Sequence, residues 1–132
     1  MFRKHWSLLA EHQDCDLCPA SESASHIVLR CYPASVIWVA FHMDDLACSS
    51  TNIVHFIYSA ERAWINSRGV HILFATAAVT LWHARNDRVL NNNRWPPSYL
   101  KRYMSQLLQD WQHRAKWQAD KVAITSWMYL LN

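Results

Sequence analysis

Residues 70–89, VHILFATAAVTLWHARNDRV, carry the apolar pattern that decides the class of fold. Apolar side chains recur there at every third and fourth position, which is the spacing of one face of an α-helix. They are Leu73, Phe74, Ala77, Ala78, Leu81, Trp82 and Val89, with Arg85 as the polar exception. The pattern predicts a long amphipathic helix that ends at the asparagines of residues 91–93.

The most hydrophobic part of this stretch, residues 70–82, is too short to cross a bilayer. His71, Thr76 and Thr80 interrupt it, and a membrane span needs about 20 apolar residues. We therefore expect a buried helix and no membrane association.

A second helix is predicted downstream, after Pro96 and Pro97, because proline suits the first turn of a helix. Its apolar positions are Leu100, Tyr103, Met104, Leu107, Leu108 and Trp111. The pattern continues through Trp127 with weaker phase, which leaves room for a break near residues 118–121.

Upstream, residues 44–52 are mostly polar and predict a connector, with a further segment beginning near Ile53. Only Leu8 to Ala10 form an apolar run near the N-terminus, which is too short for a signal peptide. We therefore expect an intracellular chain, in the nucleus or the cytoplasm, whose cysteines stay reduced.

The length and composition are those of a folded protein with a hydrophobic core large enough for one domain. The chain has 132 residues, of which 52% are hydrophobic and 13% aromatic, so it should fold. Its single glycine, Gly69, excludes the glycine-rich loops that bind nucleotide phosphates. The net charge of +3 is modest. The basic residues are scattered and make a nucleic-acid footprint only if they converge on one surface.

Four candidate metal ligands follow one another near the N-terminus. Cys15, Cys18, His26 and Cys31 read Cys-x2-Cys-x7-His-x4-Cys. Thiolates and imidazole suit zinc, whereas magnesium and calcium prefer oxygen. Four protein ligands fill the tetrahedron and leave no position for a reactive water, so the expected Zn²⁺ is structural.

These residues have two other interpretations. In the first, the cysteines are ordinary thiols and His26 lies on the surface. In the second, Cys15 and Cys18 form a redox dithiol. The dithiol needs a preceding strand and a βαβ context, and the sequence shows neither. Cys48 lies far from the cluster and is expected to be a small buried or half-buried side chain.

The string of residues 41–46, FHMDDL, resembles the aromatic-x-Asp-Asp box that holds catalytic metals in reverse transcriptases. Two-metal catalysis needs a further carboxylate on a neighbouring strand, and few residues precede Asp44 and Asp45. We interpret the pair as solvated carboxylates at a helix end or in a linker. No nucleophile, base and orienting residue occur together, so we expect neither an enzyme nor a small-molecule substrate.

The stretch from Cys15 to Trp38 resembles the reverse transcriptase zinc-binding domain of plant non-LTR (LINE-type) retrotransposons and of host proteins derived from them. The matching residues are Cys15, Cys18, Glu22, Ser23, His26, Cys31, Ala34, Ile37 and Trp38. Residues 82–89, WHARNDRV, are similar to the Trp-x-x-Arg-Asn-x-x-Val element that often follows this domain. The resemblance implies that the four ligands bind zinc and that Ile37 and Trp38 pack the next helix against the zinc turn.

These observations predict a mainly α protein: a small zinc-stapled module at residues 1–47, which includes the following helix, and a helical segment at residues 48–132. The expected function is non-catalytic, with contact to single-stranded RNA or DNA or to a reverse transcriptase. Candidate nucleic-acid contacts are Arg3, Lys4, Trp6 and Arg30. The alternatives are a zinc-stapled helical module that binds another protein, and a decayed retroelement fragment without selected function.

Overall fold

The computed structural model describes residues 17, 23–63 and 67–131. Within these ranges the regular structure is helical and contains no strand, which confirms the prediction of a mainly α fold. The elements are η1 (His26–Arg30), α2 (Tyr32–Ala40), α3 (Asp44–Ser49), α4 (Ile53–Ala63), α5 (Ser67–Asn91), α6 (Pro97–Arg114) and α7 (Gln118–Leu131).

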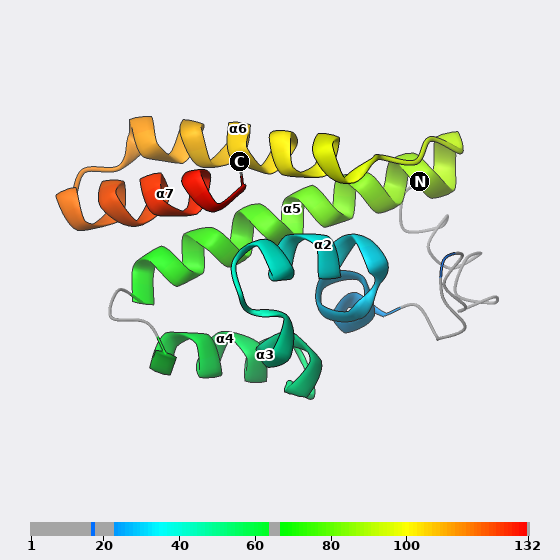
Figure 1. Ribbon diagram of the computed structural model, residues 1–132, viewed down its shortest axis with the longest axis horizontal. Helices are drawn as coiled ribbons and strands as arrows, with labels where there is room; N and C mark the ends of the chain where they lie inside the picture. The colour runs from blue at the N-terminus through cyan, green and yellow to red at the C-terminus, as the bar shows by residue number, and fades with distance from the viewer. Residues whose placement is uncertain (1–16, 18–22, 64–66, 132) are drawn as a thin grey trace, which may run out of the picture.

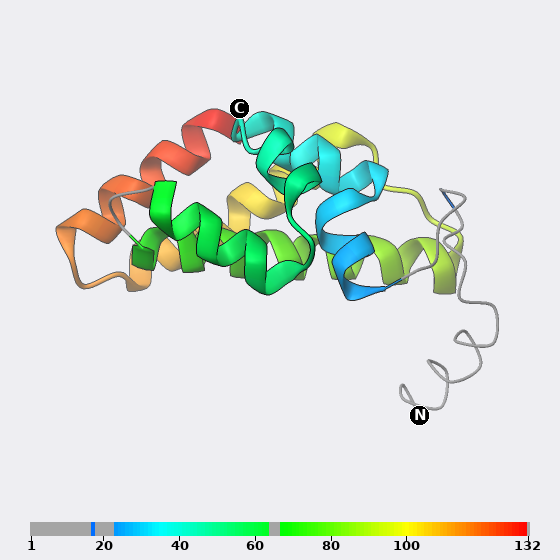
Figure 2. The same ribbon diagram turned by 90° about the horizontal axis from the view of Figure 1, so that it is seen from below.

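Helix α5 runs through the middle of the molecule, with α6 and α7 on one side and α2, α3 and α4 on the other (Figure 1). It contacts η1, α2, α4, α6 and α7. Seen from below, α4 crosses in front of α5 (Figure 2). Helix α2 also reaches α6 and α7. The amphipathic stretch predicted from the sequence is therefore the element around which η1, α2, α4, α6 and α7 pack.

The two threonines that interrupt the hydrophobic stretch are buried in α5 without disturbing it. The hydroxyl of Thr76 donates to the carbonyls of Ile72 and Leu73 at 3.0 and 2.9 Å, and that of Thr80 donates to the Thr76 carbonyl at 2.8 Å. A buried hydroxyl is tolerated when it is hydrogen-bonded. His71, by contrast, is exposed and lies 3.2 Å from a carboxylate oxygen of Glu61 on α4.

The end of α5 and the start of α6 agree with the sequence, but the break between α6 and α7 is earlier than expected. Helix α5 ends at Asn91, and Asn92 takes a left-handed φ of 54°, a conformation that asparagine tolerates after a helix. The break between α6 and α7 falls at residues 115–117, ahead of residues 118–121. Ala115 is extended there, and its N–H still donates to the carbonyls of Trp111 and Gln112.

The prediction of a connector over residues 44–52 is wrong for most of its length, because Asp44–Ser49 form helix α3. Asp44 and Asp45 occupy its first turn, where negative charge interacts favourably with the helix dipole. Ala47 is buried and Leu46 packs against the core. Only residues 50–52 connect α3 to α4, which begins at Ile53 as expected.

Side chains from both sides of residue 47 contribute to one hydrophobic cluster, which extends from Ile27 to Leu131. At its centre the Trp38 ring lies 4.8 Å from that of Phe56 and 6.4 Å from that of Phe74. Phe41 meets Trp127 of α7 edge to face at 5.7 Å. Among the described helices, none is long and apolar enough to cross a membrane.

Candidate metal centre

The structure describes two of the four predicted zinc ligands. His26 begins η1 and Cys31 follows directly after it. Cys15 and Cys18 lie outside the described residues, as do Arg3, Lys4 and Trp6. The geometry of the site is therefore built from the His26–Cys31 half of the motif.

His26 and Cys31 stand at the two ends of a single wide turn. Element η1 is a π-helix of five residues, and the N–H of Cys31 donates to the carbonyl of His26 at 2.8 Å. This hydrogen bond spans five residues where an α-helix spans four, and single π-turns are frequent at functional sites. The x4 spacing of the motif thus corresponds to one closed ring of backbone that carries a candidate ligand at each end.

Both ends of this turn are fixed by local hydrogen bonds. The hydroxyl of Ser23 accepts from the His26 N–H at 3.1 Å, and the Ser23 carbonyl accepts from the Ile27 N–H at 2.9 Å. Cys31 is extended, with φ −67° and ψ 158°, and its carbonyl accepts from the Ser35 N–H at 3.0 Å. Cys31 is therefore also the N-terminal cap residue of α2.

The donor set of this turn fits a zinc site. The exposed fraction is 7% for His26 and 3% for Cys31, so both lie in surroundings that exclude most water. An imidazole nitrogen and a cysteine sulfur are the donors that zinc prefers. The described residues contain no group of three or more candidate ligands. Completion of a tetrahedral site would therefore require Cys15 and Cys18.

Trp38 of α2 links this π-turn to the other helices by packing and a hydrogen bond. Its side chain is fully buried, and its indole N–H donates to the Val28 carbonyl of η1 at 2.7 Å. A buried carbonyl in a π-turn needs such a donor, because an unpaired polar group in the interior costs free energy. Ile37 is fully buried as well. Trp38 thus packs α2 against the turn of His26 and Cys31, while zinc at that turn stays a prediction.

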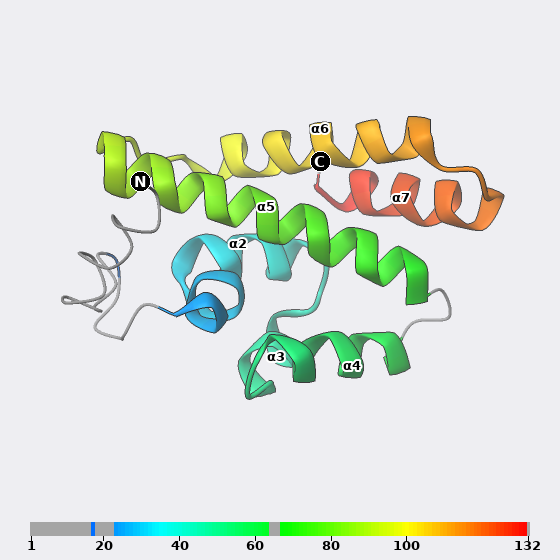
Figure 3. The same ribbon diagram turned by 180° about the vertical axis from the view of Figure 1, so that it is seen from behind.

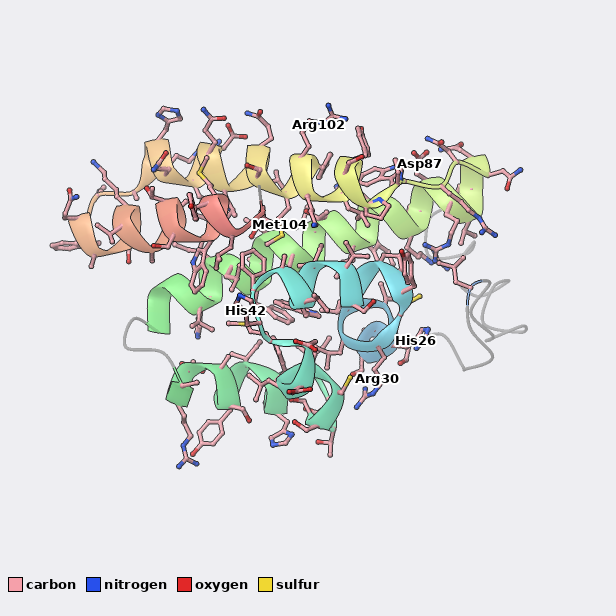
Figure 4. All side chains as sticks on the ribbon, viewed as in Figure 1. His26, Arg30, His42, Asp87, Arg102 and Met104 are labelled. Atoms are coloured by element: carbon pink, nitrogen blue, oxygen red, sulfur yellow. The ribbon has the colours of Figure 1, made fainter. Side chains whose placement is uncertain are left out.

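Arg30, one of the candidate nucleic-acid contacts, ties η1 to α3. Its side chain is exposed, and its guanidinium donates to the carbonyl of Ser50, the residue that caps the C-terminal end of α3. Figure 4 shows Arg30 and His26 on neighbouring parts of the same turn. The guanidinium therefore has a structural partner within the fold.

The downstream element WHARNDRV lies on α5 and faces the same region. Element η1 contacts α5 and lies beside its C-terminal half in Figures 1 and 3. Arg85 and Arg88 are buried there, and the Arg85 guanidinium lies 5.6 Å from the centre of the Trp82 ring. The Arg85 guanidinium also donates to the Asn86 side-chain oxygen at 3.0 Å. Element η1 is therefore packed beside the half of α5 that carries residues 82–89 (Figure 1).

Asp87, which the sequence did not single out, organises the end of α5. Its carboxylate accepts from the indole N–H of Trp95 at 2.7 Å and from the side-chain amides of Asn91 at 2.8 Å and Asn93 at 2.7 Å. These hydrogen bonds, that of Trp95 first, lower the pKa of Asp87 below its ordinary value of 3.8. The carboxylate holds the loop between α5 and α6 in place.

The lowered pKa of Asp87 predicts a pH-dependent contribution to stability. A group with a depressed folded pKa stabilises the fold above its unfolded value, here 3.8, and loses that effect as the pH falls through its folded value. We expect Asp87→Asn to melt at a lower temperature than the wild type at pH 7. The difference between the two melting temperatures should shrink as the pH falls below 3.8. Melting curves followed by circular dichroism measure both. Asp110→Asn, at an exposed position of α6, is the matched control, and a gap independent of pH contradicts the assignment.

Comparison with known proteins finds no match at any of three levels. No family model, no curated protein and no solved structure matches the chain.

Proposed function

We propose that the protein is a non-catalytic zinc-binding module in which Cys15, Cys18, His26 and Cys31 hold one structural zinc ion. The observation that supports it most is the buried π-turn, which carries His26 and Cys31 at its two ends. Bound zinc supplies a four-coordinate cross-link between the N-terminal segment and this turn. The resemblance to the zinc-binding domain of LINE-type reverse transcriptases points in the same direction.

The same resemblance suggests that the module contacts single-stranded RNA or DNA, next to a reverse transcriptase. A non-catalytic role is consistent with the position of Asp44 and Asp45 in the first turn of α3. Polymerase chemistry uses two metal ions and needs carboxylates that converge on both. A pair in one helical turn holds only part of such a site.

A second candidate function, binding to another protein, is favoured by apolar side chains on α7. The exposed fraction is 55% for Val122 and 80% for Tyr129 on α7, and 59% for Trp117 just before it. Exposed aromatic side chains are enriched at protein interfaces. The nucleic-acid proposal is preferred because single exposed apolar residues are common on protein surfaces.

The proposed zinc site predicts one zinc ion per chain after expression with metal, measured by elemental analysis. Cys18→Ser and His26→Ala should each lower the zinc content far below one per chain, because a structural site needs all four ligands. The matched control is Cys48→Ser. Cys48 is exposed on α3, not buried or half-buried as the sequence analysis expected, and should not affect zinc. Equal loss in all three variants, or no stoichiometric zinc in the wild type, contradicts the proposal.

A further inference from the structure

A continuous group of aromatic rings lies where the loop after α5 meets the start of α6. The Trp95 ring centre is 4.7 Å from that of Tyr99 and 4.9 Å from that of Tyr103, and Tyr103 is 6.0 Å from His83 of α5. Trp95 and Tyr99 meet edge to face, with an angle of 89° between their planes. In this arrangement the edge of one ring meets the face of the other. Tyr99 keeps 39% of its surface exposed, whereas Trp95 and Tyr103 are half-buried. We call Trp95, Tyr99 and Tyr103 the aromatic surface.

The Asp87 carboxylate holds Trp95, one of the three rings of the aromatic surface, in place. The indole N–H of Trp95 is fixed at 2.7 Å from one carboxylate oxygen, while Asn91 and Asn93 donate to the same group. A ring that is held before binding loses little conformational freedom when a ligand stacks on it. Because three donors already surround the carboxylate, its charge is partly compensated within the protein.

Positive charge lies directly beside these rings on α6. The Arg102 guanidinium is 5.8 Å from the centre of the Tyr99 ring. Arg102 and Lys101 also line a hollow of about 530 Å³ along α6. The other residues that line it are Ser98, Ser105, Gln106, Gln109 and Leu131. In Figure 4, Arg102 and Asp87 both lie toward the α6 edge of the molecule, whereas His26 lies on the other side of α5.

The hollow and the aromatic surface form two neighbouring stripes on one helix. The positions 98, 101, 102, 105, 106 and 109 recur at intervals of three and four, as do Tyr99 and Tyr103. Arg102 lies over the Tyr99 ring and also lines the hollow. The hollow offers cationic, hydroxyl and amide groups, which bind phosphate oxygens, while the adjacent rings offer π-faces.

We propose that this face of α6 binds single-stranded nucleic acid, with bases stacked on Trp95, Tyr99 and Tyr103 and phosphates along Lys101 and Arg102. An acidic peptide would pair with the cations, but its carboxylates would not stack on the aromatic surface. Single-stranded RNA and DNA combine regularly spaced negative charge with flat rings that stack on aromatic side chains. This inference rests on the nucleic-acid part of the proposed function and locates it away from the metal turn.

The test is a fluorescence-anisotropy titration of zinc-loaded protein with labelled oligouridine and oligothymidine at two salt concentrations. Tyr99→Ala should weaken binding about tenfold, the loss expected when one stacked base loses its platform. Arg102→Ala should weaken binding and reduce the slope of log affinity against log salt by about 0.7, the value for one phosphate on a single strand. The two oligonucleotides should bind alike, since neither contact uses a 2′-hydroxyl.

The chain offers a matched control for each change. Tyr129→Ala removes an exposed tyrosine from α7, and Arg114→Ala removes an exposed arginine from the far end of α6; both should bind like the wild type. Tyr99→Phe keeps the ring and should also bind like the wild type, which separates stacking from a folding defect. Photo-cross-linking of a halogenated oligonucleotide, followed by peptide mapping, should label residues 95–103.

The outcomes separate this inference from the proposed function. If the wild type binds, and Tyr99→Ala and Arg102→Ala bind equally well, the α6 face is excluded while the zinc module remains. The α6 face is also excluded if Cys18→Ser loses binding, both α6 variants keep it, and the cross-links map near the metal turn. If the wild type does not bind either oligonucleotide at low salt, both the inference and the nucleic-acid part of the proposed function are wrong. The zinc content is measured separately and is not affected by that result.

Discussion

Removal of zinc by a chelator is expected to loosen the segment around His26 and Cys31 while α5, α6 and α7 keep their helical structure. The apparent free energy of zinc binding in small zinc-finger peptides is about 10 to 16 kcal/mol, and that energy is coupled to folding. In this chain Ile27, Val28 and Leu29 are buried in the common core. The turn therefore has apolar support besides the proposed zinc ion, and a local response is expected in place of complete unfolding.

Amide hydrogen exchange, read peptide by peptide with and without chelator, measures this expectation. Peptides that cover η1 and the start of α2 should exchange faster after chelation, whereas those from the α6–α7 hairpin should change little. The His26→Ala variant should exchange like the chelated wild type and should not respond to chelator, which makes it the control. Uniform acceleration over the whole chain would contradict a local role. An unchanged pattern would contradict zinc binding at this turn.

Trp38→Ala is expected to cause the largest loss of stability of any single side-chain change at the site. The fully buried ring packs against Phe56 and Phe74 and donates to the Val28 carbonyl. Truncation of a buried tryptophan to alanine costs about 3 to 5 kcal/mol. This loss corresponds to a fall in melting temperature on the order of 10 °C for a chain of this size. Zinc affinity should fall as well, because the Val28 carbonyl belongs to the π-turn.

Two further variants separate packing from hydrogen bonding at Trp38. Trp38→Phe keeps an aromatic ring but removes the donor to Val28, and an unpaired buried carbonyl costs about 1 to 3 kcal/mol. It should therefore lie between the wild type and Trp38→Ala in thermal melts. Trp117→Ala, at an exposed position, should stay within about 0.5 kcal/mol of the wild type. If Trp38→Ala and Trp117→Ala have similar melting temperatures, Trp38 does not fasten the turn.

Sequence periodicity predicted the two long helices, α5 and α6, whose apolar residues recur at helical spacing and are mostly buried or half-buried. The repeats that begin at Leu73 and at Leu100 locate α5 and α6, because a long stripe of apolar residues has one satisfactory solution in water. Helix α3 escaped prediction because it has only six residues. Its position depends on the packing of Ala47 in the core, which is a tertiary contact and cannot be read from local sequence. The same limit applies to the end of α6, where the phase of the pattern alone does not locate the extended Ala115.

In the candidate site too, the sequence predicts the residue types, whereas their conformation and surroundings depend on tertiary packing. Ligand spacing selects Cys15, Cys18, His26 and Cys31 as candidate metal ligands. The x4 interval from His26 to Cys31 is compatible with several backbone conformations, so it does not predict the π-turn against which Trp38 packs. The role of Asp87 depends on the chain reversal at Asn92, since Asn93 and Trp95 come within reach only after it. Tyr103 belongs to the apolar repeat that predicted this helix, whereas Tyr99 does not and was not singled out by the sequence. Whether such a ring is buried or exposed depends on which neighbouring helix covers it.

The position of α5 has a consequence for how this protein responds to its environment. One side of its C-terminal half touches the turn of His26 and Cys31, and His83 on the same half touches Tyr103 of the aromatic surface. A single continuous helix therefore connects the proposed metal site to the proposed binding face. Free energies linked through one element are reciprocal. Any strengthening of nucleic-acid binding by zinc must be matched by an equal strengthening of zinc binding by nucleic acid.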